Sequence, residues 1–165
     1  MLMSADLLAN VVALLAVGLM LYIAWHDFWH LTIRNSSVLA LFGLYVAWVG
    51  LSGLQTLAGD LGTGFILFVV GFVMWRGGMM GGGDVKLYFV LGLFMGFDNV
   101  GLFAAGLLLT TVLFLLALRI AARITSGGDF LIRLRAIRDS GRAPYAVPLC
   151  MAAVPLILLR ISSSG

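Results

Sequence analysis

Two of the seven aspartates lie in sequence surroundings that could support hydrolytic chemistry. Asp27 lies among the aromatic residues and histidines of segment 25–30, at the end of an apolar run, and Asp84 follows three glycines at the start of another apolar run. Two carboxylates that lie close together cannot both ionise, so they share one proton. The ionised carboxylate can then deprotonate a water molecule while the protonated one donates to a peptide carbonyl. This pair predicts aspartyl hydrolysis of a peptide bond, a reaction that requires no metal and no cofactor.

A plainer interpretation of both residues remains open. Asp27 and Asp84 could be two interfacial helix caps that never meet. The other five aspartates are expected at helix ends or in loops, where water reaches them and they serve as solvated caps or turns. These five are Asp6, Asp60, Asp98, Asp129 and Asp139.

The glycine-rich segment before Asp84 favours the hydrolytic interpretation. Five of the seven residues 77–83 are glycine, interrupted only by Met79 and Met80. Such a segment tolerates positive φ and lets another backbone approach closely, as an extended substrate peptide must. We therefore expect Gly81, Gly82 and Gly83 to shape the substrate side of the site. The apolar runs on either side are short, which predicts a water-accessible notch near Asp84.

The composition places these residues in a membrane protein. Hydrophobic residues make up 62% of the 165 residues and charged residues only 10%, with a mean hydropathy of +1.13. So few charges cannot cover a water-soluble surface, which excludes a soluble globular protein, a nucleic-acid binder and a disordered chain. Backbone polar groups in lipid must be satisfied internally, so the apolar runs should be helices. The sequence predicts one all-α transmembrane domain over residues 1–165, with six spans at about 7–25, 37–54, 61–75, 85–97, 100–118 and 145–159.

Basic residues set the expected orientation. Nine of the ten lie in the connections after the first, third and fifth runs, and only Arg160 lies on the other side. The positive-inside rule therefore places these connections in the cytoplasm and both termini outside. Asp27 and Asp84 then lie on the cytoplasmic side at similar depth, where they can meet.

The longest cytoplasmic loop, 119–143, contains apolar residues at helical spacing between arginines. This pattern predicts an amphipathic helix lying on anionic headgroups, and a docking surface for a cytoplasmic partner is the alternative. Lys86 follows Asp84 by two residues, so on a regular helix it points away from Asp84 and is expected to reach the headgroups.

Three motifs together resemble a known family. Gly81-Gly82-Gly83-Asp84 resembles the Gly-x-Gly-Asp signature of intramembrane aspartyl proteases, and its Val-Lys-Leu continuation resembles the type IV prepilin peptidases. That family has its other aspartate at the end of an early helix, followed by Ile-Pro-Asn. Here Asp27 is followed by Ile33-Arg34-Asn35, with arginine in place of proline, and Pro144-Tyr145 precedes the last run as in the family.

The resemblance implies a multi-pass enzyme of the bacterial inner membrane. Its members remove the basic leader of prepilins or pseudopilins, which continue as a hydrophobic helix, at the cytoplasmic face. Asp27 and Asp84 would be catalytic, with Lys86 and Asn35 in support and no cofactor. Larger relatives carry a four-cysteine region and methylate the new N-terminus. This chain has a single cysteine, so it is similar to the short, peptidase-only branch of Flp/Tad pilus systems. Pilus assembly proteins and membrane lipids are the expected partners, with no nucleic acid.

Two other functions remain open. His26 and His30 flank Asp27 at the spacing of a zinc protease, and Asp84 could be a third ligand. The lone Cys150 excludes a cysteine-based zinc site. A non-enzymatic ion or proton conductor would use Asp27 and Asp84 as intramembrane carboxylates.

Overall fold

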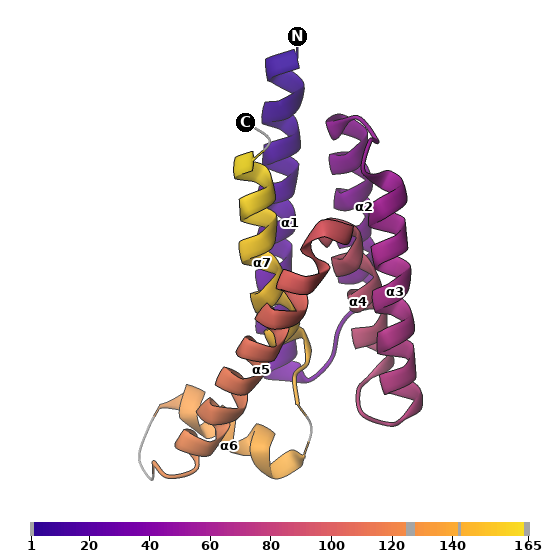
Figure 1. Ribbon diagram of the computed structural model, residues 1–165. Helices are drawn as coiled ribbons and strands as arrows, with labels where there is room; N and C mark the ends of the chain where they lie inside the picture. The colour runs from indigo at the N-terminus through magenta and orange to yellow at the C-terminus, as the bar shows by residue number, and fades with distance from the viewer. Residues whose placement is uncertain (1, 125–127, 142, 164–165) are drawn as a thin grey trace.

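The computed structural model describes residues 2–124, 128–141 and 143–163 and is all-α (Figure 1). Within these residues it contains seven α-helices and one short 3₁₀ helix. The elements are α1 (Leu2–His30), α2 (Asn35–Ser52), α3 (Leu57–Arg76), α4 (Gly82–Met95), η1 (Phe97–Asn99), α5 (Val100–Ala121), α6 (Asp129–Ser140) and α7 (Ala146–Ser163).

Each of the six predicted apolar runs forms a helix, but the helices differ in length from the predicted spans. Four of the described helices, α1, α2, α3 and α5, are long and apolar enough to cross a membrane. Helix α7 is apolar but shorter by the same criterion. Helix α4 begins at Gly82 and has 14 residues, so it is only about 21 Å long.

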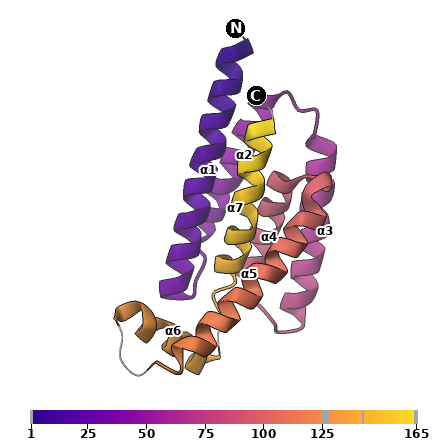
Figure 2. The ribbon, with the colours of Figure 1, turned by 60° about the vertical axis from the view of Figure 1, so that its left-hand side comes forward.

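Small residues line the interior face of α1. Ala9, Ala13 and Ala16 are buried, whereas Leu7, Leu8 and other large residues of the same helix are exposed. In lipid this arrangement is favourable, because small side chains let helices pack closely while large apolar side chains face the acyl chains. Helix α7 contacts both α1 and α5, and Figure 2 shows it lying between them.

Helix α4 is the most enclosed element. Ten of its 14 residues are buried, as expected for a helix that is apolar on all sides. Glycines allow its close contact with α3: a Cβ built on Gly92 would lie 2.7 Å from the Cα of Gly64. The turn after α4 lies below the upper ends of α1 and α2 in both views, so α4 ends inside the bundle (Figures 1 and 2).

One aspartate contradicts its predicted environment. Asp60 was expected in a solvated turn, but its side chain is 1% exposed. Its carboxylate accepts hydrogen bonds from the Tyr45 and Thr56 hydroxyls, at 3.0 and 2.9 Å, and pairs with Arg160 at 3.2 Å. Arg160 also donates to the carbonyl oxygen of Phe94 at 2.7 Å. The last carbonyls of a helix have no partner within it, so this network satisfies a carbonyl at the end of α4.

The amphipathic helix predicted in loop 119–143 is α6. Its buried Leu134 and Ile137 pack with Phe28 of α1 and Leu118 of α5. Its other face includes exposed apolar and basic residues, and α6 lies at the end of the molecule opposite the start of α1 (Figure 1).

Candidate active site

Asp27 and Asp84 line the same cavity, which has a volume of about 510 Å³. The cavity is enclosed by the end of α1, the start of α4 and three connecting segments. Its other lining residues are Leu31, Thr32, Ile33, Gly78, Met79, Met80, Gly81, Gly83, Gly141, Ala143 and Tyr145. The two carboxylates that the sequence singled out, 57 positions apart, are therefore brought to one place by the fold.

Asp27 is positioned by two helices. It lies one turn before the end of α1 and is 4% exposed. Its Oδ2 accepts a hydrogen bond of 3.1 Å from the backbone N–H of Ala146, the first residue of α7. The free N–H groups at a helix N-terminus favour a negative charge, so the start of α7 stabilises the ionised carboxylate.

Asp84 occupies the first turn of α4 and is 8% exposed. Its Oδ2 accepts a hydrogen bond of 3.0 Å from the N–H of Gly81, and its own N–H donates to the Gly81 carbonyl at 3.2 Å. This reciprocal arrangement resembles a capping box, in which an acidic residue of the first turn satisfies the N–H of the capping residue. The Asp84 side chain is thereby fixed by its own helix start.

The glycines before Asp84 have distinct physical roles. Gly78 has a φ of +72°, which an L-residue with a side chain rarely adopts. Gly83 lies against the connection between α1 and α2, where a Cβ would be 3.2 Å from the Cβ of Ile33. These two positions bring the α3–α4 turn and the α1–α2 turn together at the cavity. Gly82, expected beside them, is not among the cavity's lining residues.

The two expected supporting residues contact each other. Lys86 Nζ donates a hydrogen bond of 3.0 Å to Asn35 Oδ1, joining the first turn of α4 to the start of α2. Both side chains are exposed and face away from the cavity of Asp27 and Asp84. Lys86 points away from Asp84 as expected.

Two arginines of α6 contact neighbouring helix ends. Arg133 Nε donates to the carbonyl oxygen of Phe28 at 2.8 Å, and Arg135 Nε donates to that of Ala121 at 3.1 Å. Basic groups near helix C-termini satisfy unpaired carbonyls and interact favourably with the helix dipole. The ring of Phe130 also stacks on Phe28 at 5.1 Å, so α6 supports the turn of α1 that carries Asp27.

The histidines form local contacts. His26 Nδ1 donates to the Thr32 carbonyl at 3.1 Å, His30 Nδ1 donates to the His26 carbonyl at 3.0 Å, and the two rings stack at 4.2 Å. Among the described residues, no three histidine, cysteine or acidic side chains are grouped as metal ligands. The zinc site considered for His26 and His30 therefore has no third ligand among the described residues.

The segment before α7 contributes to the cavity, although the sequence predicted no site residue there. Gly141, Ala143 and Tyr145 line the cavity, and Ala146 binds Asp27. The local signal for this segment is the Pro144-Tyr145 pair directly before α7.

This arrangement has the components that hydrolysis by a carboxylate pair needs. It combines two buried carboxylates, a cavity that can hold water and a peptide, and glycine-rich backbone beside Asp84. Among the described residues, neither carboxylate forms a salt bridge with lysine or arginine.

Comparison with known proteins identifies the family. No curated protein and no solved structure matches the chain. Residues 14–126 match the family model of the type IV leader peptidases, and this segment includes both Asp27 and Asp84. Because the match covers more than half of the sequence, the chain belongs to the type IV leader peptidase family and is an aspartic-type prepilin peptidase.

Proposed function

We propose that the protein removes the N-terminal leader of prepilin-like substrates at the cytoplasmic face of the bacterial inner membrane. Asp27 and Asp84 are the catalytic residues of this proposal. The observation that carries it is that both side chains are buried and line one cavity beside the glycine-rich turn.

The reaction follows from two carboxylates that share one proton. The ionised carboxylate takes a proton from water, and the water oxygen bonds to the carbonyl carbon of the scissile peptide. The protonated carboxylate donates its proton to the carbonyl oxygen. The tetrahedral intermediate then collapses and the C–N bond breaks. The first carboxylate passes its proton to the leaving amine, and a hydroxyl group of the intermediate returns a proton to the second carboxylate. One water is consumed, and the products are a carboxylic acid and an amine, which ionise to a carboxylate and an ammonium group.

The surrounding backbone holds the two acids in place. The N–H groups of Ala146 and Gly81 each donate to one carboxylate, and these donors come from different segments of the chain. An extended substrate peptide would lie along the turn 78–83, where glycines leave room for its backbone.

The membrane arrangement of this proposal has six spans, with both termini outside. The ends of α1, α3 and α5, which precede the basic connections, lie at the same end of the molecule as α6 (Figure 1). This end faces the cytoplasm by the positive-inside rule. Helix α4 is shorter than the hydrocarbon core of about 30 Å, and the Arg160 network satisfies its inner end. Helix α6 lies on the headgroups.

The protein acts without methylating its product and belongs to the short branch typical of Flp/Tad pilus systems. Its single Cys150 is buried in α7, so the chain has no four-cysteine motif. Pilus assembly proteins would receive the processed substrate.

The test is leader cleavage of a co-expressed prepilin. Wild type is compared with Asp27→Ala, Asp84→Ala and the double variant His26→Ala/His30→Ala, each with and without a zinc chelator. The proposal requires loss of cleavage in both aspartate variants and full cleavage in the histidine variant with chelator. Loss with the chelator and the histidine variant would instead support zinc chemistry. A wild type that cleaves no prepilin, but conducts ions in an Asp27-dependent way, would support the conductor.

A further inference from the structure

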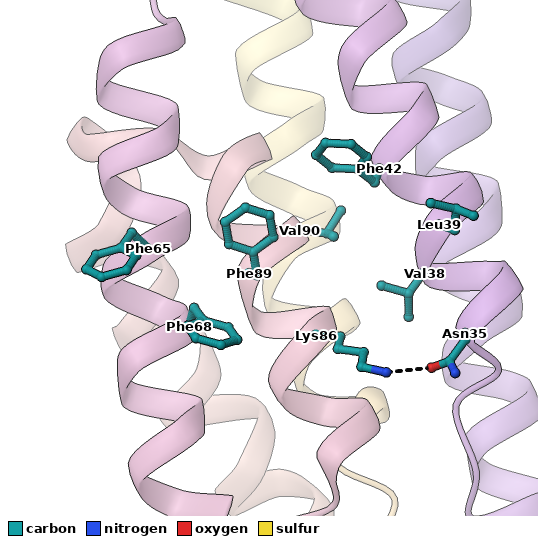
Figure 3. Close-up of a pocket in the computed structure, with 9 residues that line it drawn as sticks. All are labelled: Asn35, Val38, Leu39, Phe42, Phe65, Phe68, Lys86, Phe89 and Val90. Carbon is teal, nitrogen blue, oxygen red and sulfur yellow. Dashed lines mark hydrogen bonds between the residues drawn. The ribbon is translucent and has the colours of Figure 1, made fainter.

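A second recess, separate from the cavity of Asp27 and Asp84, lies between α2, α3 and α4 (Figure 3). It has a volume of about 670 Å³ and is bounded by α2, α3 and α4. Leu39 and Phe42 of α2 form one wall, Phe65 and Phe68 of α3 form the other, and Phe89 of α4 lies between them (Figure 3). We call this recess the α2–α4 groove.

Aromatic packing gives the groove a formed floor. The ring of Phe89 lies 6.5 Å from that of Phe42 and 6.3 Å from that of Phe68, so the floor aromatic contacts both walls. The rims remain open, because Leu39 is 69% exposed and Phe65 is 64% exposed. The groove is therefore open to an apolar ligand that approaches through the membrane.

The polar end of the groove is formed by residues that are close in sequence to the cavity of Asp27 and Asp84. These residues are Lys86 and Asn35, which are joined by their hydrogen bond (Figure 3). Lys86 lies two residues after Asp84, and Asn35 lies two residues after Ile33, which lines the catalytic cavity. The groove and the cavity have no lining residue in common, but both border the start of α4 and the chain around the start of α2.

We propose that the α2–α4 groove binds the apolar membrane helix of the prepilin, on the C-terminal side of the scissile bond. This inference rests on the proposed function, because it names where that substrate lies. A peptide bond at the border of an apolar helix reaches Asp84 only if the helix lies in lipid beside the first turn of α4. The groove provides that position.

The positive charge of Lys86 favours binding of the apolar helix, and not of the basic leader, in the groove. Lys86 is the only lysine of the chain, and its amine contacts a neutral amide. Among the described residues it forms no salt bridge. A cation at the polar end of the groove disfavours the basic leader there, so the leader extends through the cavity toward the cytoplasm and the uncharged helix enters the groove.

A different apolar recess, separate from the α2–α4 groove, provides a matched control. It has a volume of about 370 Å³ and is lined by α1, α5, α6 and α7. Met151 of α7 lines it and is 51% exposed, comparable to Leu39 and Phe65. No charged residue lines this recess. Its lining residue Phe28 follows Asp27 on α1, but Asp84 lies on none of its helices.

Site-specific photo-crosslinking tests the position of the substrate helix. The crosslinker p-benzoylphenylalanine replaces Leu39, Phe65 or Met151 in the Asp84→Asn variant, which retains uncleaved substrate. The protein is reconstituted in phospholipid vesicles with a prepilin. We expect crosslinks to the prepilin from positions 39 and 65 and about tenfold fewer from position 151. Equal or stronger crosslinking from position 151, adducts of phospholipid alone at 39 and 65, or crosslinks only to a second copy of the chain would each overturn the inference.

Kinetics separate this inference from the proposed function. Leu39→Trp places a larger ring at the open rim and should raise KM for the full prepilin about fivefold with kcat unchanged, whereas Met151→Trp should change neither. A peptide that spans the cleavage site but lacks the apolar helix should be cleaved equally by all three proteins. Unchanged KM in Leu39→Trp refutes the groove while leaving peptidase activity established. A wild type that cleaves neither substrate refutes the proposed function and the inference with it.

Discussion

The molecule buries carboxylates at both ends of α4, and the two regions differ in what surrounds them. Near the end of α4, Asp60 is 1% exposed and is bound by Arg160, Tyr45 and Thr56. Near its start, Asp27 and Asp84 are 4% and 8% exposed, and each accepts a hydrogen bond from one backbone N–H. Burial alone therefore does not identify a site of chemistry.

The two regions differ in whether a paired cation offsets the negative charge of the buried carboxylate. A buried carboxylate is costly unless a cation and hydrogen bonds offset the loss of water. Arg160 offsets this cost for Asp60, and its guanidinium also lies 4.6 Å from the centre of the Trp48 ring. Asp27 and Asp84 line one cavity, and among the described residues neither forms a salt bridge with an arginine or a lysine. We infer that the pair reduces this cost by sharing a proton. We infer that the Asp60 region is structural and that the Asp27 region is reactive.

The largest expected effect comes from removing either member of the reactive pair. Asp27→Asn and Asp84→Asn should each lower kcat for prepilin cleavage by about 10²–10⁴-fold, because each removes an acid–base group. The double variant should be no slower than the slower single variant, since the two residues act as one unit. Single-turnover cleavage in detergent measures all three rates. Losses that multiply in the double variant would mean that the two aspartates act independently.

Removing Arg160 should affect stability rather than chemistry. Arg160→Met leaves Asp60 buried without its cation and should destabilise the fold by about 3–5 kcal/mol. Adding Asp60→Asn to this variant should recover part of the loss, because the buried charge is then absent. Thermal unfolding in detergent measures both variants. An Arg160→Met protein as stable as wild type would show that the network does not hold the end of α4.

The contact of α4 with α3 should tolerate no added methyl group. In Gly92→Ala the new Cβ would lie within 3.0 Å of backbone atoms of Thr63 and Gly64, so the helices must move apart at a cost of about 1–3 kcal/mol. Gly62→Ala on α3 is the matched control, because nothing lies within 4 Å of its added Cβ. The difference in melting temperature between the two variants is the readout, and equal values would contradict the close packing.

The smallest effect is expected at the hydrogen bond between Lys86 and Asn35. Lys86→Met and Asn35→Ala should each reduce cleavage about fivefold, corresponding to loss of about 1 kcal/mol of positioning. The double variant should lose no more than either single variant. Additive losses would indicate that the two residues act separately, for instance with Lys86 bound to a lipid headgroup.

The sequence predicted the helices and the paired aspartates because both leave local signals. Apolar runs predict helices in lipid, and the glycines before Asp84 and the aromatic surroundings of Asp27 are visible in short segments. The boundaries were less accurate: α1 begins at Leu2 and α4 at Gly82, both earlier than predicted. Helix α4 is too short to count among the four clear candidate spans.

The environment of Asp60 could not be predicted, because its partners on α2 and α7 are distant in sequence. Tyr45 is 15 residues away and Arg160 is 100 residues away, and nothing in the local sequence joins them. The hydrogen bond from the N–H of Ala146 to Asp27 could not be predicted for the same reason, because the two residues are 119 positions apart. Arg133 and Arg135 were expected on the headgroup surface, but they bind carbonyls at the ends of α1 and α5. Such contacts depend on the packing of whole helices.

The most direct test compares one aspartate from each region in the same assay. Wild type, Asp84→Asn and Asp60→Asn are reconstituted in vesicles, and each is measured for prepilin cleavage and for thermal unfolding. We predict that Asp84→Asn loses cleavage and keeps the melting temperature of wild type. Asp60→Asn should have a lowered melting temperature and should still cleave the prepilin at temperatures where it is folded. Cleavage by Asp84→Asn at the wild-type rate, or its loss in a folded Asp60→Asn protein, would contradict the assignment of chemistry to the Asp27 and Asp84 cavity.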